Sequence, residues 1–424
     1  MIKIILLVLF YFTFPLLIIF LCKKWSILQK LGTIVFAYGF GLLLGSSGIF
    51  PEGSSQYKLN LQGRAALPGK ELEKLISEGA VPVEDRFVNQ IASVQDLIPS
   101  VVVPLAFPLL LFSLNLKRWL KYARKGFISV ALAIIAGLVM VTAGFFIWKD
   151  SIPDSWKLAG MFEGIYTGGT PNFVAIKMAL NVDPNLFVIV STYDMIVGAG
   201  LVLFFITIAP RIFRFILPKF TEEKGISIEA EQITKETENL DDFSGMLNKK
   251  TFLPLMKALG ISVVIFALAW GLSLALPMLP QMVVVILSIT TLAILASLIK
   301  PINRIEKTFQ LGMYLILVFS LTIASMADVK SMFGIGMLNI MMFISWCYFG
   351  SLILHLILAK IFRVDADNFL ITATAFIFSP PFVPLVANAL KNKDVIITGI
   401  TGGIIGYILG NYFGVALAYF LKGF

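Results

Sequence analysis

The sequence predicts an all-α protein that crosses a membrane many times. Its 424 residues are 58% hydrophobic and 14% charged, whereas an ordinary soluble domain has about 25% charged residues. Apolar runs close to the bilayer-spanning length of about 20 residues recur along the whole chain. A transmembrane β-barrel would instead show alternating segments of about ten residues. The composition therefore excludes a cytosolic enzyme, a nucleic-acid binder and a disordered scaffold.

Twelve apolar segments are candidates for membrane insertion. They are 2–22, 31–50, 96–116, 126–148, 158–182, 184–209, 252–276, 281–299, 309–328, 331–361, 368–390 and 394–421. The first segment is expected to be a spanning helix rather than a signal peptide, because no small-residue cleavage site follows it. Two polar linkers separate the segments, and the second divides the chain into halves of similar size. The predicted domains are scaffold helices 1–50, an extracytoplasmic linker 51–95, core repeat 96–209, a cytoplasmic linker 210–251, scaffold helices 252–308 and core repeat 309–424.

The charges of the loops predict that one apolar segment of the first half does not cross. Lys and Arg concentrate in cytoplasmic loops, and both 117–125 and 211–219 are rich in them. Three full crossings between these loops would end on the wrong side. Segment 158–182 is the best candidate for a re-entrant hairpin, because Thr-Gly-Gly-Thr-Pro-Asn at its centre contains helix breakers.

The same reasoning applies to segment 368–390, whose centre reads Ser-Pro-Pro-Phe-Val-Pro. We therefore predict ten full crossings and two re-entrant hairpins. The alternative is that both segments cross the membrane as broken helices, which gives twelve crossings and violates the charge rule once.

The two halves are predicted to be inverted repeats. Thr-Pro-Asn-Phe-Val at 170–174 resembles Ser-Pro-Pro-Phe-Val at 379–383, and each motif precedes the last helix of its half. Segments 96–116 and 309–328 share Phe-Ser-Leu but are predicted to run in opposite directions. Inverted repeats with discontinuous helices are the usual architecture of secondary transporters.

The two breaks are the predicted substrate site. Non-helical backbone at membrane depth is tolerated only inside protein or around a water-filled cavity, and helix ends at a break present dipoles to an ion. The alternative is that Gly and Pro only kink structural helices. The candidate substrate-binding residues are Gly168, Gly169, Thr170, Pro171, Asn172, Ser379, Pro380, Pro381 and Asn388.

Asp194 is the candidate ion-coupling residue, because a carboxylate within an apolar run is costly and usually marks an ion or proton pathway. With Thr192 it is a candidate Na⁺ site, or it accepts a proton. Thr401 occupies the matching position in the second half. The alternative role for Asp194 is a packing hydrogen bond.

Other polar residues within apolar segments are weaker candidates. Glu163 and Lys177 lie in the two arms of the first predicted hairpin, where they either pair or hold a substrate charge. His355, the single histidine, is expected to be structural. No catalytic residues are predicted, and no cofactor is expected other than Na⁺ as a coupling ion.

The stretch Tyr-Thr-Gly-Gly-Thr-Pro-Asn-Phe-Val-Ala at 166–175 and the Asp194 helix that follows resemble the YjcL-like membrane family, known mainly as domain of unknown function 819. The resemblance covers nearly the whole chain. More distantly, the hairpins resemble those of glutamate–sodium symporters, and the halves resemble the cation–proton antiporter and bile-acid transporter group. This resemblance implies an elevator-like carrier. The second hairpin departs from it, because Phe-Ser-Pro-Pro-Phe-Val-Pro is not rich in glycine pairs.

The predicted function is secondary active transport of a small organic anion or an amino-acid- or peptide-like solute, coupled to Na⁺ or H⁺. The expected partners are the solute, the lipid bilayer of a bacterial inner (plasma) membrane and a second copy of the chain, with no nucleic acid. A passive channel or facilitator and a cation/proton antiporter without organic substrate are the alternatives. An intramembrane enzyme is a third hypothesis, and the absence of paired acids argues against it.

Overall fold

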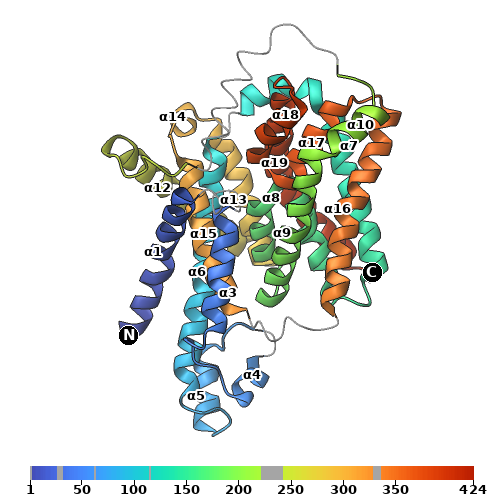
Figure 1. Ribbon diagram of the computed structural model, residues 1–424. Coiled ribbons are helices and arrows are strands. Elements are labelled where there is room, and N and C mark those ends of the chain that lie inside the picture. Colours follow the sequence, from blue (N-terminus) through green and yellow to red (C-terminus); the bar gives the residue numbers. More distant parts are fainter. Residues whose placement is uncertain (1, 26–31, 62–63, 114–115, 221–241, 328–335) are drawn as a thin grey trace. The chain divides into compact units, whose positions relative to one another are not determined.

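The computed structural model describes residues 2–424 except 26–31, 62–63, 114–115, 221–241 and 328–335, and every regular element in these ranges is a helix (Figure 1). Half of the predicted linker 210–251 (residues 221–241) and the start of the predicted segment 331–361 therefore lie outside the described residues. The all-α prediction is confirmed for the part of the chain that the structure describes.

Among the described residues, eight helices are long and apolar enough to cross a membrane. They are α1 (Ile2–Lys24), α6 (Asp85–Phe112), Gly126–Trp148 of α7 (Leu116–Trp148), α9 (Pro184–Thr207), α12 (Lys249–Ala275), α15 (Thr308–Met326), Met337–Ile361 of α16 (Gly336–Ile361) and α19 (Ile396–Leu421). Shorter apolar helices are α3 (Thr33–Ser46), α13 (Gln281–Ser297), α17 (Ala366–Phe378), and the run of η3 (Pro380–Phe382) and α18 (Val383–Leu390). The remaining helices are the broken α8 (Ser155–Ala179) and the short α4 (Ser55–Leu61), α5 (Gly69–Ser77), α10 (Ala209–Ile216) and α14 (Lys300–Asn303).

The described chain forms two compact units. Unit 1 comprises Met1–Ala106, Val182–Ile189 and Met313–Gly334, and unit 2 comprises Phe107–Asn181, Val190–Gly312 and Ile335–Phe424. This division differs from the predicted scaffold and core, since most of α6 and α15 falls with α1 while α12 falls with the hairpins. The predicted functional boundaries stay predictions, because compactness alone does not show which unit moves.

Unit 1 is held together by a buried polar contact among three helices. The Gln95 side chain of α6 donates a hydrogen bond to the Tyr11 hydroxyl of α1 at 2.7 Å, and that hydroxyl lies 2.6 Å from the Ser325 hydroxyl of α15. Gly45 lets α3 approach the same point, since a Cβ there would lie 2.6 Å from the Ser325 carbonyl oxygen. Buried polar groups that satisfy one another specify one arrangement of these helices.

The predicted polar linker 51–95 is folded. Asp85 begins α6 eleven residues before the predicted segment, because its carboxylate accepts hydrogen bonds from the Ser54 amide at 3.0 Å and the Ser54 hydroxyl at 2.5 Å. Helix α5 within it is amphipathic and buries Leu72. Together α4 and α5 bury a small apolar cluster of Tyr57, Leu67, Leu72 and Val81.

Asn89 of α6 connects this segment to the rest of unit 1. Its side-chain oxygen accepts hydrogen bonds from the Leu67 amide at 2.7 Å and the Tyr57 hydroxyl at 2.8 Å, and its amide donates to the Leu67 carbonyl at 3.0 Å. Burial, together with the nearby charge of Asp85, raises the pKa of Tyr57 to about 12. The Tyr57 hydroxyl is therefore a neutral donor at physiological pH.

Asn89→Ala is predicted to loosen the segment 51–84 without unfolding the membrane helices. The change leaves three buried polar groups without a partner, and each such group costs about 1–3 kcal/mol. Limited proteolysis of the full chain in lipid nanodiscs should give faster cleavage between α4 and α6. The exposed neighbour Gln90→Ala is the control, and equal cleavage rates for the two variants would contradict the prediction.

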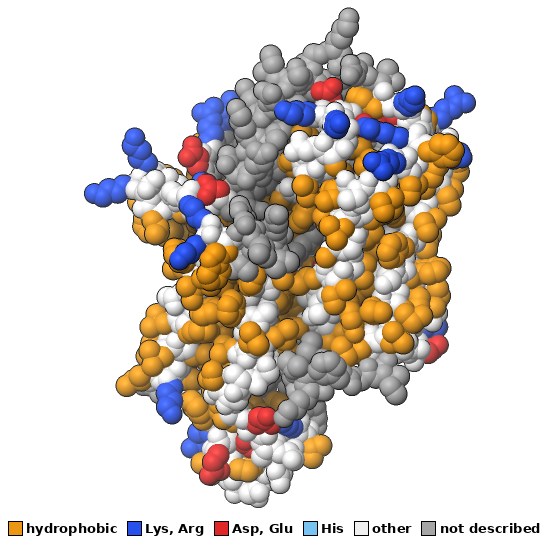
Figure 2. Space-filling view, in the orientation of Figure 1, with side chains coloured by type: hydrophobic (Ala, Val, Ile, Leu, Met, Phe, Trp, Pro, Cys, Tyr) orange, Lys and Arg blue, Asp and Glu red, His pale blue; other side chains and the backbone are white. Residues whose placement is uncertain are grey.

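Unit 2 is built around α19. Helices α7, α8, α13 and α17 all pack against it, α16 packs on α7, and α12 packs on α13. At the end of unit 2 that carries α10, Lys and Arg side chains gather, while apolar side chains cover the flank (Figure 2). This is the distribution expected for a cytoplasmic end next to lipid.

Candidate functional site

The first break lies at Gly169, where the backbone of α8 has φ 65° and ψ −165°. Before the break, Gly160 meets α19 at Gly414, since a Cβ on Gly160 would lie 2.5 Å from the Gly414 carbonyl oxygen. After the break, the Ile176 side chain returns to the same Gly414. Sixteen residues of straight helix would separate Gly160 and Ile176 by about 24 Å at 1.5 Å per residue. The two arms of α8 therefore fold back on each other as a hairpin with its tip at Gly168–Gly169.

The second break lies at Ser379, which has φ 74° and ψ 163°. Here α17 and α18 also fold back, because a Cβ on Gly399 of α19 would lie 2.8 Å from both Ile371 of α17 and Val383 of α18. Pro380 at the tip lies against Gly403, 2.6 Å from the position of its missing Cβ. A positive φ is uncommon outside glycine, so Ser379 occupies a strained position.

The base of the second hairpin is fastened by α10. The Nε and Nη2 atoms of Arg214 each donate a hydrogen bond to the Asp367 carboxylate at 2.8 Å, and Nη2 also donates to the Leu390 carbonyl at 2.8 Å. Asp367 belongs to the first turn of α17 and Leu390 to the last turn of α18. One guanidinium thus joins the two arms at their open end.

The two tips touch beside the middle of α19. A Cβ on Gly169 would overlap the Ser379 hydroxyl oxygen. The base of the first hairpin lies near the C-terminal end of α19, where the rings of Trp156 and Tyr419 are 5.9 Å apart. The second hairpin instead begins near the start of α19. The hairpins therefore approach from opposite ends of α19 and meet within unit 2 (Figure 1).

Asn172 fixes the first tip to α19. Its fully buried side-chain amide donates hydrogen bonds to the carbonyl oxygens of Gly406 at 3.3 Å and Tyr407 at 3.2 Å. Its side-chain oxygen accepts no hydrogen bond from any described residue. Gly168, Gly169 and Pro171 are buried beside it, whereas Thr170, Ser379 and Pro381 are partly exposed. The predicted tip residues are thus together, and three of them are accessible.

The two tips differ in the hydrogen-bond donors that they offer. The arm that begins at Thr170 leaves its first backbone N–H groups outside the helical ladder. In the second hairpin, Pro380 and Pro381 have no N–H, and the Phe382 amide donates to the Ser379 carbonyl at 3.2 Å. An anion at the tips would therefore be held mainly by the start of the second arm of α8.

Asn388 and Thr401 are not brought to the tips. Asn388 is exposed near the base of the second hairpin, and its carbonyl accepts a hydrogen bond from the Lys391 amide at 3.1 Å. Thr401 is buried in α19, and its hydroxyl has no hydrogen-bond partner among the described residues. Gly403, two residues later, lies against Pro380.

Asp194 is connected to the first hairpin through one tyrosine. The Tyr348 hydroxyl of α16 donates a hydrogen bond to the Asp194 carboxylate. The Tyr348 ring packs against Phe162 in the first arm of α8, with ring centroids 4.8 Å apart. Asp194 is only partly buried. Its side chain is therefore accessible and is also connected to the first hairpin through Tyr348.

The predicted Na⁺ site at Asp194 and Thr192 does not fit the geometry. Both lie in the continuous helix α9, and side chains two positions apart on a helix do not face each other. The Asp194 carboxylate already accepts the Tyr348 hydroxyl. Among the described residues, no group of three His, Cys, Asp or Glu could hold a metal ion. We therefore do not treat the two side chains as a joint Na⁺ site, and Asp194 alone stays a candidate ion-coupling residue.

Glu163 is a buried acid that the predicted site did not include. Its side chain is fully buried in the first arm of α8, and neither carboxylate oxygen accepts a hydrogen bond from any described residue. The considered pairing with Lys177 is therefore not formed as a hydrogen bond to either Glu163 oxygen. His355 lies buried 3.4 Å from the Ser129 hydroxyl and beside the Phe369 ring.

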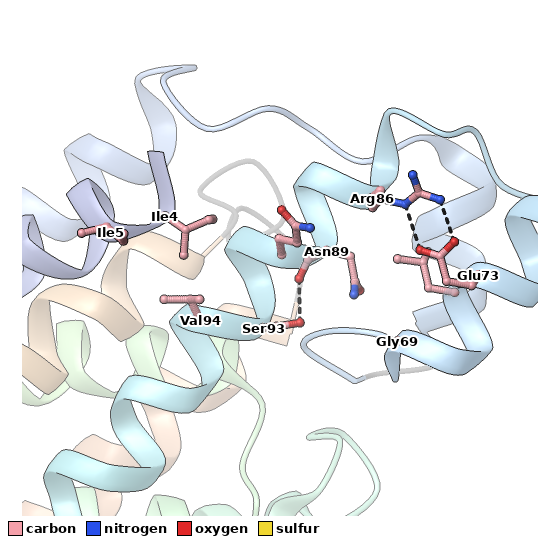
Figure 3. A pocket seen from close by; sticks show the side chains of 10 residues that line it. Ile4, Ile5, Gly69, Glu73, Arg86, Asn89, Ser93 and Val94 are labelled. Atoms are coloured by element: carbon pink, nitrogen blue, oxygen red, sulfur yellow. Dashed lines mark hydrogen bonds and ion pairs between the residues drawn. The ribbon is translucent and has the colours of Figure 1, made fainter. Parts of the chain in front are cut away.

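A separate pocket of about 650 Å³ lies in unit 1 between α1, α5 and α6 (Figure 3). Its charged groups are already paired, since Arg86 binds Glu73 at 2.8 and 2.6 Å. Asn89 at its wall is used by the three hydrogen bonds described above. None of the predicted site residues lines it, so the hairpin tips remain the stronger candidate. The lining residues are Ile4, Ile5, Gly69, Leu72, Glu73, Arg86, Asn89, Gln90, Ser93 and Val94.

Comparison with known proteins places the chain in a family. Residues 86–424 match the family described as "Protein of unknown function (DUF819)". The chain belongs to the DUF819 family. It is also similar to the "Uncharacterized membrane protein YjcL" of Bacillus subtilis (strain 168), with 26% identity over 357 residues, 82% of this chain and 86% of the relative. The family match includes α6 to α19 and both hairpins, and it confirms the resemblance seen at 166–175. This DUF819 protein is a multi-pass membrane protein.

Gly169→Ala is predicted to destabilise unit 2. An alanine at this φ is strained, which costs about 1–3 kcal/mol, and its Cβ overlaps the Ser379 hydroxyl. Thermal unfolding in detergent should show a lower midpoint than for the wild type. Gly198→Ala in α9 is the matched control, because its Cβ would meet nothing within 4 Å.

Adding Ser379→Ala to Gly169→Ala separates the backbone strain from the overlap with the Ser379 hydroxyl as causes of the destabilisation. Removing the hydroxyl relieves the overlap but not the backbone strain, so the double variant should recover part of the lost midpoint. Equal midpoints for Gly169→Ala and Gly198→Ala would contradict the proposed contact of the tips.

Proposed function

We propose that this protein is a secondary active transporter of a small organic anion or an amino-acid- or peptide-like solute. The observation that carries the proposal is the meeting of two broken segments beside the middle of α19. Discontinuous helices from two repeats form the substrate sites of many secondary transporters. The proposal includes that 96–209 and 309–424 are inverted repeats whose hairpins are re-entrant.

The tips carry hydrogen-bond donors and acceptors that suit a small anionic or zwitterionic solute. The start of the arm at Thr170 supplies backbone donors and a partial positive charge. Thr170 and Ser379 are partly exposed and would contact the solute, while Asn172 would hold the tip in place through Gly406 and Tyr407. Carbonyl oxygens at the ends of the first arm and of α17 would face the positive part of a zwitterion.

An elevator-like movement is part of the proposal. Both tips and the whole of α19 belong to unit 2, so a solute bound at the tips could move with that unit. The expected localisation is a bacterial inner membrane, with a homodimer as the assembly. Mass photometry of the protein in nanodiscs tests the dimer directly.

A passive channel or facilitator is the less favoured function. It requires a continuous polar path, whereas Gly168, Gly169, Pro171 and Asn172 are buried at the tips. A cation/proton antiporter without organic substrate would use Asp194 alone. The proposal includes no enzymatic activity.

The function is tested first by a ligand screen. Purified protein in detergent is heated with amino acids, dipeptides and carboxylates, at several pH values and with or without Na⁺. A solute that raises the unfolding midpoint is then assayed for uptake into proteoliposomes. A transporter should accumulate it against its gradient when an ion gradient is imposed, whereas a facilitator should only equilibrate it.

Asn172→Ala is predicted to lower uptake by about tenfold or more, since losing about 1.4 kcal/mol at the site is a tenfold effect. The reason is that the tip loses both hydrogen bonds to α19. Asn388→Ala, at the exposed base of the second hairpin, should transport normally. Normal uptake by Asn172→Ala at equal expression would remove Asn172 from the site.

Asp194→Asn is predicted to retain solute exchange but to lose most of its response to an imposed pH or Na⁺ gradient. The asparagine keeps an acceptor for Tyr348 but carries no titrating charge. Thr192→Ala is the matched control on the same helix, and it should couple as the wild type does. Unaltered coupling in Asp194→Asn would exclude Asp194 from ion coupling.

A further inference from the structure

Glu163 lies in an environment that does not suit a structural carboxylate. Its side chain is 0% exposed, and both oxygens lack a hydrogen-bond partner among the described residues. An ionised carboxylate without a partner in a dry interior is very costly, whereas the neutral acid is tolerated. A purely structural acid would be expected to find a donor, as Asp367 does with Arg214.

The Glu163 carboxyl group lies between two elements of unit 2. It faces α7 at Gly137, where a Cβ would be 3.3 Å from its Oε2 atom and 2.5 Å from the Tyr166 ring. Gly137 thus makes room for an acid and a tyrosine that lie one helical turn apart on the first arm. A larger residue on α7 would fill this space.

The ionisable groups around Glu163 are few. Tyr166 on the same arm and Cys347 on α16 interact electrostatically with it, and Tyr348 follows Cys347. Lys177 lies on the second arm and has an interaction, but neither Glu163 oxygen accepts a hydrogen bond from a described residue. The Gly126–Trp148 part of α7 and the whole of α13 contain no titratable side chain. On α17, Asp367 is bound to Arg214. On α19, Tyr407 lies beside Gly169 and has an interaction, the Tyr412 hydroxyl bonds Thr291, and Tyr419 packs on Trp156. No described cation is therefore bound to Glu163.

Glu163 is also mechanically connected to the tip. The Thr167 hydroxyl donates to the Glu163 carbonyl at 2.7 Å, and Thr167 contacts Gly406 and Gly410 of α19. Phe162, its neighbour in sequence, packs on the Tyr348 that binds Asp194. Rearrangement of the tip on solute binding would shift the first arm and change the access of water to this acid.

We propose that Glu163 is a proton-binding site of the transport cycle, which holds one proton as a neutral carboxylic acid in the arrangement described here and releases it when the first arm moves. The reaction is the simple equilibrium between a carboxylic acid and a carboxylate plus a proton, and it needs no other reactant. The proposal deepens the proposed function, on which its role in transport rests, by making H⁺ a coupling ion at a site separate from Asp194.

Infrared spectroscopy of the full chain in lipid vesicles, without solute, tests the proton site directly. The wild type should show the carbonyl stretch of a neutral carboxylic acid at pH 7, which shifts in D₂O and disappears reversibly at alkaline pH. Glu163→Gln should lack this band, and Asp194→Asn should retain it. Persistence of the band in Glu163→Gln overturns the proposal, as does a Glu163 band that neither exchanges in D₂O nor titrates.

The glutamine variant also tests the protonation state through folding. Glutamine has the shape of the neutral acid, so Glu163→Gln should unfold at a midpoint close to that of the wild type, and Glu163→Lys at a much lower one. A Glu163→Gln protein that does not fold would overturn the proposal, because the structure would then need the charge.

Proteoliposome assays with radiolabelled amino acids and dicarboxylates connect the site to transport. Glu163→Gln should keep solute counterflow, but its accumulation driven by a pH gradient should be about tenfold lower than that of the wild type. Full pH-driven accumulation by Glu163→Gln would overturn the coupling role of Glu163. If the wild type takes up none of these solutes while the infrared band behaves as expected, the proposed transport function fails and the proton site stands.

Discussion

The architecture of unit 2 depends on the contact between Gly169 and Ser379. Two chain reversals, one from each half of the sequence, meet where neither backbone is helical. Such close approach requires a residue without Cβ on one side, and Gly169 also needs its freedom to adopt a positive φ. The proposed transport function follows from that meeting point, because it places helix ends, two hydroxyl groups and a buried amide together in the apolar interior.

Helix α19 makes this contact possible. Gly403 accepts Pro380, and Gly406 and Gly410 accept Thr167 and the Asn172 amide. Small residues at this spacing let backbones approach closely where burial from water cannot drive association. The Asn172 side-chain amide donates additional hydrogen bonds to two carbonyl groups of α19, so this buried donor is satisfied in an apolar environment. The Arg214 ion pair fixes the opposite end of the second hairpin, so its tip is anchored while it remains partly exposed.

The sequence predicted the hairpins because their signals are local. Gly169, Pro171 and Pro380 interrupt apolar runs, and the conflict in loop charges required a reversal. What it could not supply was the direction of single side chains. Thr192 and Asp194 look adjacent in sequence but point apart on α9, and Asn388 lies at the wrong end of α18. Glu163 was noticed, yet only the structure shows that Lys177 does not neutralise it. The folded segment before α6 was missed because its stability comes from Asn89, a long-range partner that composition does not reveal.

The most direct test of this account is cross-linking of the two tips. In a variant with Cys22 and Cys347 replaced by alanine, the pair Thr170→Cys and Ser379→Cys should react rapidly with a short bifunctional thiol reagent in native membranes. The pair Thr170→Cys and Asn388→Cys should not, because Asn388 lies at the base of its hairpin. Comparable cross-linking of the two pairs, or none for the first in a folded protein, would contradict the meeting of the hairpins.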